Sequence, residues 1–475
     1  MIDMTSKVAM LRRLLPTSLA LALFAATCNG ALAQDSITLE DAINLSLSNN
    51  PSLNQTRLQT NSSDLSVGVA RSEFQLSVRP EGGVLLDDEG DSSGFYGLRV
   101  SKKTGYGGEI SVSGINDSLF GAEGGNRFNV QFSQPLFRQA GTLVNREGIV
   151  QAEQSYLSSL RALELSRSRT VVAVVEAYEQ VLRLEQQLAA DEQALQRAAS
   201  LYKLTLAKER LGRTTRIDTL RVQLQQGEAV SRTSNTREQL SSARRVLGEL
   251  MGREGGALPR LEPAPMFQVE FASLEEATNL AMANRLEYAQ AQQEYEDSIR
   301  ATRIAKRFKL PDMTLVARYE HNDNDLLLDE DLNGFRNAWY LSLVSDTDFN
   351  KNREKLEYEQ SLVQQSSALE NLRAQYLAIG REVEQALLAY LRAHKQLDVL
   401  EGNFQHAGAR LKLARRLFRV GRTDGFSVTD AEQAYFTAQS TWLNGRSDAS
   451  IAGYRLLHAT GTLVETPANL KPKAS

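Results

Sequence analysis

The residues most able to bind a metal or transfer a proton are scattered along this sequence. The four histidines are His321, His394, His406 and His458. Their positions show no metal-ligand spacing, and the only cysteine is Cys28, so a structural zinc site is not expected. The motifs of nucleophilic hydrolases, phosphate-binding loops and zinc proteases do not occur. The sequence therefore predicts no enzymatic activity, no cofactor and no metal.

An acidic segment between positions 320 and 331 is the nearest match to a calcium-binding loop. The residues that follow the spacing of the first half of such a loop are Asp329, Asp331, Asn333 and Gly334. The twelfth position is Tyr340, where the loop requires a bidentate glutamate. The flanking segments also alternate like strands, whereas the calcium motif needs flanking helices. A solvated hairpin loop is therefore favoured over a calcium site.

Two Gly-Arg-Thr segments are better candidates for a functional role. They are Gly212-Arg213-Thr214 and Gly421-Arg422-Thr423. In each segment the glycine can adopt the left-handed geometry that ends a helix, and we expect the threonine to cap the helix that follows. The arginine would then be exposed at a helix tip, where it can contact a partner protein.

The distribution of proline predicts long helices in place of several globular domains. Only 10 of the 475 residues are prolines, with none between Pro135 and Pro259 or between Pro311 and Pro467. Because proline breaks helix interiors, these two gaps permit helices far longer than the globular average. The net charge of −4 gives no strongly basic surface, so nucleic acid is not an expected partner.

The segment 1–33 is typical of a secretory signal peptide. A basic beginning and an apolar stretch over 14–26 lead to the cleavage tripeptide Ala31-Leu32-Ala33. Cys28 lies in a poor context for lipid attachment, so we expect an exported chain with no cysteine and no disulfide. No later stretch of 18 or more apolar residues occurs, which excludes a transmembrane helix. Such an exported protein is periplasmic, secreted or an outer-membrane barrel.

The remaining chain contains two copies of one unit. Thr38-Leu39-Glu40 returns as Ser273-Leu274-Glu275 at an offset of 235, and both copies carry the hydroxyl-and-acid spacing that caps a helix start. The Gly-Arg-Thr segments, and Gly252 with Gly461, are instead 209 apart. The first copy therefore holds 235 − 209 = 26 extra residues. They are expected near 90–125, as a longer strand pair or an added hairpin.

Apolar residues recur every seven positions before each Gly-Arg-Thr segment. In the second copy they are Leu362, Leu369, Tyr376, Val383, Tyr390, Leu397, Phe404, Leu411 and Phe418. In the first copy they are Leu160, Val174, Val181, Leu188, Leu195 and Tyr202, with an interruption at Arg167. This spacing predicts a coiled-coil seam, and a helix over about 350–419 would be about 100 Å long. Each copy is thus predicted to be a long helical hairpin that packs on neighbours.

Before each long helix the apolar period changes to two, which predicts strands. The alternating segments are Tyr96-Leu98-Val100, Ile110-Val112, Phe128-Val130-Phe132, Met313-Leu315-Ala317-Tyr319 and Trp339-Leu341-Leu343. This pattern suits either a half-buried soluble sheet or a barrel with a wet interior and a lipid-facing exterior. One strand pair per copy gives four strands per chain, whereas membrane barrels have about 8 or more, so closure needs several chains.

Together these features resemble the outer-membrane efflux protein family typified by TolC. The likeness rests on the double repeat with its capped opening helices, the strand ending Gln134-Pro135-Leu136-Phe137 and the two Gly-Arg-Thr turns, and it covers residues 37–463. It implies a mainly α-helical chain with a membrane β-barrel part. In the implied homotrimer, long coiled-coil hairpins form one α-barrel tunnel, and four or more strands per chain contribute to one twelve-stranded β-barrel.

The resemblance also implies a function, a location and partners. It indicates the exit duct of a tripartite efflux pump or a type I secretion system, which spans the cell outer membrane, contacts its lipid and extends into the periplasm. A periplasmic adaptor and an inner-membrane transporter are the implied partners. The alternative is a periplasmic coiled-coil adaptor or structural protein with a soluble β domain, although two equivalent hairpins in tandem fit this poorly.

The implied periplasmic constriction supplies the remaining candidate residues. In the family, carboxylates after each tip turn form an acidic ring, and the corresponding positions are Asp218 in the first copy and Ser427 and Asp430 in the second. Ser427 takes a place where the family can have an acid, so the implied ring rests on Asp218 and Asp430. Such a ring favours cations, although Asp218 is equally placed to stabilise a helix start. The two Gly-Arg-Thr tips correspond to the surface that meets the adaptor.

These features predict the following organisation. The expected segments are a signal peptide (1–33), a first repeat (34–252), a linker rich in glycine and proline (253–272), a second repeat (273–463) and a flexible tail (464–475). Helices are expected over about 38–75, 139–251, 273–308 and 350–460. Strands are expected over about 78–135 and 312–345.

Overall fold

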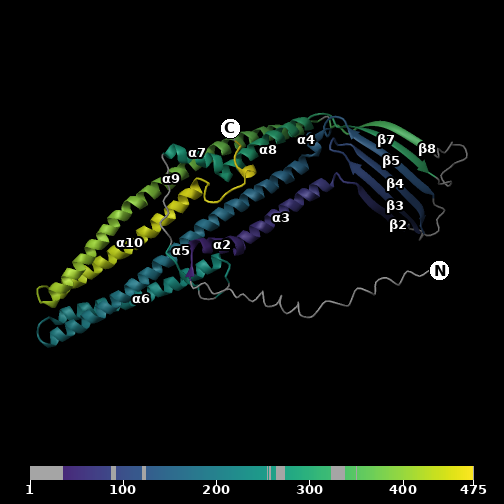
Figure 1. Ribbon diagram of the computed structural model, residues 1–475. Coiled ribbons are helices and arrows are strands. Elements are labelled where there is room, and N and C mark those ends of the chain that lie inside the picture. Colours follow the sequence, from purple (N-terminus) through teal and green to yellow (C-terminus); the bar gives the residue numbers. More distant parts are fainter. Residues whose placement is uncertain are drawn as a thin grey trace, which may run out of the picture.

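The computed structural model describes residues 36–86, 92–119, 125–253, 255, 258–263, 273–322, 337–348 and 350–473. The predicted signal peptide with Cys28, and the segment with Asp329, Asp331, Asn333 and Gly334, lie outside the described residues. Figure 1 shows a long helical body with two hairpin tips at one end and a single large sheet at the other. Among the described helices, none is both long enough and apolar enough to cross a membrane.

The first repeat contains two opening helices, four strands and a helical hairpin. Its elements are α2 (Leu39–Asn49), α3 (Pro51–Ser72), β2 (Ser77–Leu86), β3 (Ser92–Lys103), β4 (Glu109–Leu119), β5 (Asn126–Pro135), α4 (Thr142–Asn145), α5 (Glu147–Arg210) and α6 (Arg216–Leu250). The predicted capping box is present at α2, because Thr38 and Asp41 each accept the other's backbone N–H. The 64 residues of α5 span about 96 Å.

The second repeat has the same order with two fewer strands. Its elements are α7 (Leu274–Asn284), α8 (Leu286–Phe308), β7 (Met313–Asn322), β8 (Asn337–Ser345), α9 (Asn352–Arg419) and α10 (Gly425–Ala459). Ser273 caps α7 by accepting the Glu276 N–H at 3.1 Å. The 68 residues of α9 span about 102 Å, as the heptad pattern predicts.

Each long helix is flanked by two shorter helices placed end to end. Both α3 and α6 pack on α5, and both α8 and α10 pack on α9. The most buried apolar residues gather where the short helices meet, and they include Val174 and Leu247 in the first repeat and Ala277 and Val383 in the second. At the first junction β1 (Ser36–Ile37) pairs in parallel with β6 (Arg260–Leu261). These junctions are the apolar cores of the two repeats.

The sheet has the order β2-β3-β4-β5-β7-β8, and every neighbouring pair in it is antiparallel. Six strands are two more than the four per chain that the sequence predicts, and the twelve-stranded barrel that the resemblance implies also assumes four. The reason is local, because β3 and β4 form an added hairpin within the first repeat. The extra segment of the first copy is thus a hairpin and not a lengthened strand pair.

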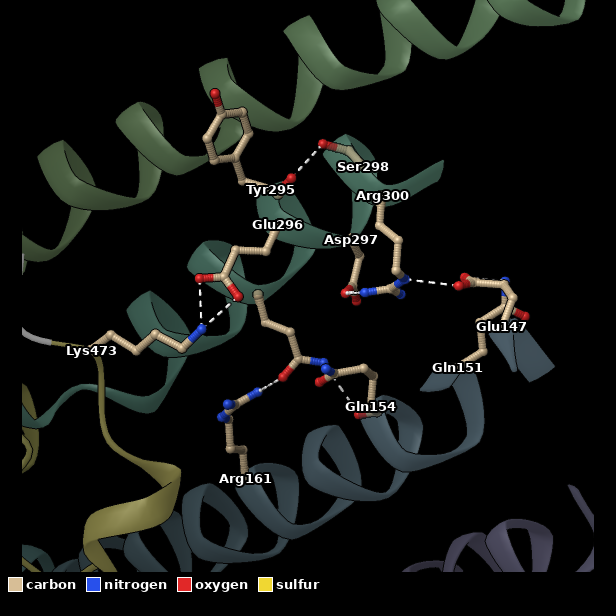
Figure 2. A network of polar contacts seen from close by, with 11 residues as sticks. Glu147, Gln151, Gln154, Arg161, Tyr295, Glu296, Asp297, Ser298, Arg300 and Lys473 are labelled. Carbon is tan, nitrogen blue, oxygen red and sulfur yellow. Dashed lines mark hydrogen bonds and ion pairs between the residues drawn. The ribbon is translucent and has the colours of Figure 1, made fainter. Parts of the chain in front are cut away.

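A polar network between α5 and α8 (Figure 2) is one of the contacts between the two repeats, which also meet where α10 packs on α5 and where β5 pairs with β7. Arg300 of α8 donates to Glu147 of α5 at 2.9 Å, and it also pairs with Asp297 at 2.7 Å. Arg161 of α5 donates to Gln290 at 3.0 Å and to Gln293 of α8. Burial lowers the pKa of Arg161, and the nearby charge of Asp297 opposes this shift.

The segment after α10 lies on this interface, although the sequence predicts a flexible tail there. Its short helix η2 (Ala468–Leu470) leaves Leu470 only 2% exposed, and the Leu470 carbonyl accepts a hydrogen bond from Arg161 at 3.2 Å. Lys473 pairs with Glu296 of α8 at 2.6 Å (Figure 2). Residues 464–473 are therefore a docked segment, held by the apolar side chains of Val464 and Leu470 and by contacts of Arg161, Lys471 and Lys473.

Candidate functional site

Both helical hairpins end in the same backbone motif. Gly212 and Gly421 have φ values of +66° and +75°, the left-handed geometry that glycine adopts without strain. The N–H of Arg213 donates to the Lys208 carbonyl at 2.9 Å, and the N–H of Arg422 donates to the Leu417 carbonyl at 2.9 Å. This six-to-one bond is the Schellman helix end, so the predicted helix stops are confirmed.

The prediction that Thr214 and Thr423 cap the following helices is wrong by one residue in each repeat. Thr215 is the N-cap of α6, and Asp424 is the N-cap of α10. The Schellman motif uses the residue after the glycine, and one further residue is needed before the chain can begin the next helix. Thr214 instead donates its hydroxyl to Asp218 at 3.1 Å.

Asp218 caps a helix, which is one of the two roles that the sequence suggests for it. Its carboxylate accepts the Thr215 hydroxyl at 2.7 Å and the Thr215 N–H at 3.3 Å, and Arg221 lies 3.5 Å away. Hydrogen bonds from Thr215, then from Thr214, and the charge of Arg221 lower the pKa of Asp218. The Asp218 side chain therefore stays charged at pH values below the usual pKa range of an aspartate.

Asp424 is a tip carboxylate that the sequence reasoning missed. It accepts the N–H of Ser427 at 3.0 Å and the Ser427 hydroxyl at 2.7 Å, so Ser427 completes the cap of α10. These bonds lower the pKa of Asp424, while the nearby charge of Asp218 opposes the shift. The usable signal was the Asp-Gly that follows Thr423, because aspartate is a preferred N-cap residue.

Asp430 is placed differently from these two acids. It lies one and a half turns into α10 and pairs with Arg410 of α9. Its charge is thus compensated within the hairpin. Of the three predicted gate residues, Asp218 and Ser427 belong to the two caps, whereas Asp430 belongs to an ion pair on the flank of the second hairpin.

The two tips contact each other through residues of both repeats. Lys208 of α5 donates to the carbonyl of Phe418 at the end of α9 at 3.0 Å, and its ammonium lies 3.8 Å from the centre of the Phe418 ring. Two turns into α10, Glu432 pairs with Arg197 of α5 at 3.3 Å and also with Arg415 of α9. Glu432 therefore joins three helices and both repeats. The side chains of Arg213 and Arg422 lie at the ends of the tips, where Arg213 is exposed and Arg422 is next to the exposed Gly421.

The sheet at the opposite end has two chemically different faces. Residues paired across antiparallel strands lie on the same face, so the register defines rows that cross the sheet. One row consists of Val78, Val100, Val112, Val130, Tyr319 and Trp339. The adjacent row on the other face consists of Arg79, Arg99, Ser113, Asn129, Glu320 and Ala338. On the apolar face Trp339 is 78% exposed and Leu341 is 64% exposed.

The described residues contain no group of three or more His, Cys, Asp or Glu side chains able to hold a metal. Among the histidines, His458 is largely buried, and its Nδ1 lies 2.7 Å from the Ser168 hydroxyl of the other repeat. Burial lowers the pKa of His458. His394 packs at 4.3 Å between ring centres on Tyr390 of the same helix. Both are packing residues of the helical body.

Several solved outer-membrane proteins share this fold. VceC, an outer membrane protein of the pathogen Vibrio cholerae, is 15% identical, with a TM-score of 0.67 over 89% of this chain and 96% of its own. The CmeC outer membrane channel of Campylobacter jejuni is 13% identical, with a TM-score of 0.67 over 91% and 87%. The open MtrE outer membrane channel of Neisseria gonorrhoeae is 16% identical, with a TM-score of 0.65 over 90% and 89%.

The sequence itself carries the family signature in both repeats. No curated protein matches the chain significantly. The family model described as outer membrane efflux protein matches two segments, residues 42–253 and 277–462, so the predicted double repeat is confirmed. This match favours a transport channel over an enzyme and over the alternative of a periplasmic adaptor. The chain therefore belongs to the outer membrane efflux protein family.

Proposed function

We propose that three copies of this chain form the exit duct of a tripartite efflux pump or a type I secretion system. The strands would line a barrel in the outer membrane, and the helical hairpins would form a tunnel through the periplasm. The observation that carries this proposal is the sheet with one apolar and one polar face, attached to helices of about 100 Å. Lipid would cover the apolar face, and water would fill the interior.

A single chain leaves too much apolar surface uncovered to be the working unit. On α9 the heptad seam is buried at Val383 (0% exposed) but open at Tyr376 (49% exposed). Leu65 of α3 and Leu224 of α6 are also exposed. Large exposed apolar areas mark interaction surfaces, and neighbouring helices of further copies are the surfaces that fit these stripes.

The tips are the proposed contact with the periplasmic adaptor, through which an inner-membrane transporter would join the assembly. Arg213 and Arg422 belong to the two tips, where two equivalent Schellman turns present them. The same end would form the periplasmic constriction, with Asp218, Ser427 and Asp430 as its proposed lining. Asp424 adds one further carboxylate to this end in each chain.

Fractionation of bacterial membranes tests the proposal directly. The chain expressed with its predicted signal peptide is expected in the outer-membrane fraction, and detergent is expected to extract a particle of three chains that dissociates on heating. Multi-angle light scattering would give the mass of the particle. A monomer in the periplasmic fraction would contradict both the proposed location and the proposed assembly.

A further inference from the structure

The β3–β4 hairpin interrupts an otherwise symmetric pair of repeats. β2 begins at Ser77 and β7 begins at Met313, an offset of 313 − 77 = 236. β5 ends at Pro135 and β8 ends at Ser345, an offset of 345 − 135 = 210. The change of offset arises between β2 and β5, which is where β3 and β4 lie. Without the insertion β2 and β5 would form one hairpin, as β7 and β8 do.

The inserted strands are bonded into the sheet on both sides. β3 pairs with β2 over ten residues, from Ser77–Ser101 to Leu86–Ser92. β4 pairs with β5 over eight residues, from Glu109–Ser133 to Asn116–Asn126. An ion pair also joins the side chains of neighbouring strands, since Arg99 of β3 pairs with Glu81 of β2 at 2.5 Å. Figure 1 shows the hairpin as part of one curved sheet.

From Tyr96 to Lys103 of β3 the inserted strands continue the two faces of the sheet in phase, and the register shifts only beyond this stretch, at a bulge between Gly94 and Tyr96. Val100 of β3 and Val112 of β4 stand between Val78 and Val130 in the apolar row. Arg99 and Ser113 take the corresponding places in the polar row. A one-residue slip would place polar side chains in lipid, so this agreement marks the hairpin as wall and not as an appendage.

We infer that β3 and β4 are strands of the barrel wall, so that three chains close a barrel of eighteen strands. The inference rests on the proposed trimer. The edge strands of the described sheet are β2 and β8, and further copies of this chain, one on each side, are the partners that satisfy them. Because six strands alternate in direction, β8 of one chain runs antiparallel to β2 of the next, which is the pairing that the rest of the wall uses.

The consequence is a wider outlet than the resemblance alone implies. With strands about 4.8 Å apart and tilted by about 40°, twelve strands give a barrel about 24 Å across and eighteen give about 36 Å. The cross-section rises about 2.3-fold at equal tilt. The membrane end of the duct would then accept bulkier cargo than a twelve-stranded barrel would.

Electron cryomicroscopy of the detergent-extracted full chain tests the inference by the number of strands around the wall. Eighteen strands in a three-fold particle support it. Twelve strands with the hairpin outside the wall overturn it and leave the trimer standing. A particle without three-fold symmetry overturns the trimer as well, so the two failures are distinguishable.

Two cysteine pairs give an independent test in the intact protein, whose own cysteine, Cys28, lies in the predicted signal peptide. Val112→Cys with Val130→Cys joins β4 to β5, whose paired positions are within disulfide range. Val78→Cys with Gln134→Cys would be adjacent only if β2 paired directly with β5. We expect efficient cross-linking of the first pair and none of the second. The reverse result overturns the inference.

Deletion of the segment 93–118 supplies a matched variant. It removes the inserted hairpin and joins 87–92 to 119–125, a connection of nearly the same length as 323–336 between β7 and β8. The variant is expected to form a trimer whose barrel is about two-thirds as wide, because twelve strands replace eighteen. A trimer of unchanged width would overturn the inference, and the cysteine pairs decide the question if the variant does not assemble.

Discussion

A β-carbon added to Gly252 would lie 2.4 Å from the carbonyl oxygen of Asn49. The second repeat has the same contact in a looser form, between Gly461 and Asn284 at 3.1 Å. In both, the left-handed residue that ends the returning helix lies against the end of the opening helix. Close backbone approach and positive φ thus require glycine for two separate reasons.

Gly252→Ala is expected to destabilise the protein more than Gly212→Ala. Both substitutions place a β-carbon in left-handed geometry, at a cost of about 1–2 kcal/mol. Only Gly252→Ala adds overpacking, about 1–3 kcal/mol more, since a β-carbon at Gly212 meets nothing within 4 Å. Thermal unfolding of the detergent-solubilised protein by circular dichroism measures the order. Equal losses would mean that the contact with Asn49 relaxes freely.

Leu341→Arg and Ser342→Arg test which face of the sheet meets lipid. Leu341 shares a face with Trp339, while Ser342 lies on the opposite face. Near the bilayer midplane a lipid-facing arginine costs about 2–4 kcal/mol, so Leu341→Arg should lower the yield of trimers in the outer membrane. Ser342→Arg should have a much smaller effect. Comparable losses in quantitative membrane fractionation would contradict the proposed facing.

The repeats and helices could be predicted from the sequence because each depends on local spacing. The caps at Thr38 and Ser273, the seam and the helix stops at Gly212 and Gly421 all follow from residue types a few positions apart. The separate strands β3 and β4 were visible as Tyr96-Leu98-Val100 and Ile110-Val112. Their insertion between β2 and β5 was not, because strand order depends on pairing between distant segments.

The candidate site was predicted less completely for a similar reason. The carboxylate of Asp430 meets Arg410, 20 positions earlier, and Glu432 meets Arg197, 235 positions earlier. No local sequence pattern predicts such pairs. The docked segment around Leu470 was also not predicted, since a short segment with few apolar residues resembles a tail until its binding surface on α5 and α8 is known.

Charge reversal at the tips is expected to impair export without impairing assembly. Arg213→Glu and Arg422→Glu change side chains at the hairpin ends, whose neighbouring backbone is held by the Schellman bonds. Arg353→Glu is a matched control, because Arg353 is exposed at the far end of α9. Drug susceptibility or cargo secretion should change for the tip variants only. If trimer yield falls in parallel, these arginines serve folding and not recognition.

Glu432→Gln is expected to loosen the contact between the two tips of one chain. The substitution removes the charge that joins Arg197 of the first repeat to Arg415 of the second. Glu176→Gln is the control, since Glu176 pairs with Arg455 at 2.8 Å between the same helices α5 and α10, further from the tips. Single-channel conductance in planar bilayers should increase several-fold for Glu432→Gln, and Glu176→Gln should leave it unchanged. An increase in neither variant would show that the pair does not hold the tips together.

Neutralisation of each tip carboxylate should reduce cation selectivity, and the size of the reduction should depend on how far the contacts of that carboxylate compensate its charge. Asp424 caps α10 through Ser427, Asp218 has Arg221 at 3.5 Å, and Asp430 is paired with Arg410. Asp424→Asn should therefore have the largest effect, Asp218→Asn a smaller one and Asp430→Asn the smallest, since narrow pores respond to uncompensated charge. Asparagine remains a good N-cap, so Asp424→Asn should leave trimer yield intact.

The pH dependence of this selectivity provides the control. The pKa values of Asp218 and Asp424 are both lowered, so each carboxylate stays charged below the ordinary aspartate value of about 3.9. A pKa that is lower in the folded state than in the unfolded state also links these caps to stability. The caps contribute their full stability at pH values above the pKa of the unfolded chain, and they lose it as the pH falls through the pKa of the folded chain. Reversal potentials measured from pH 7 to pH 4 should accordingly keep their cation preference. Loss of the preference between pH 6 and pH 5, or unchanged selectivity in Asp424→Asn with Asp218→Asn, would leave these acids as helix caps alone.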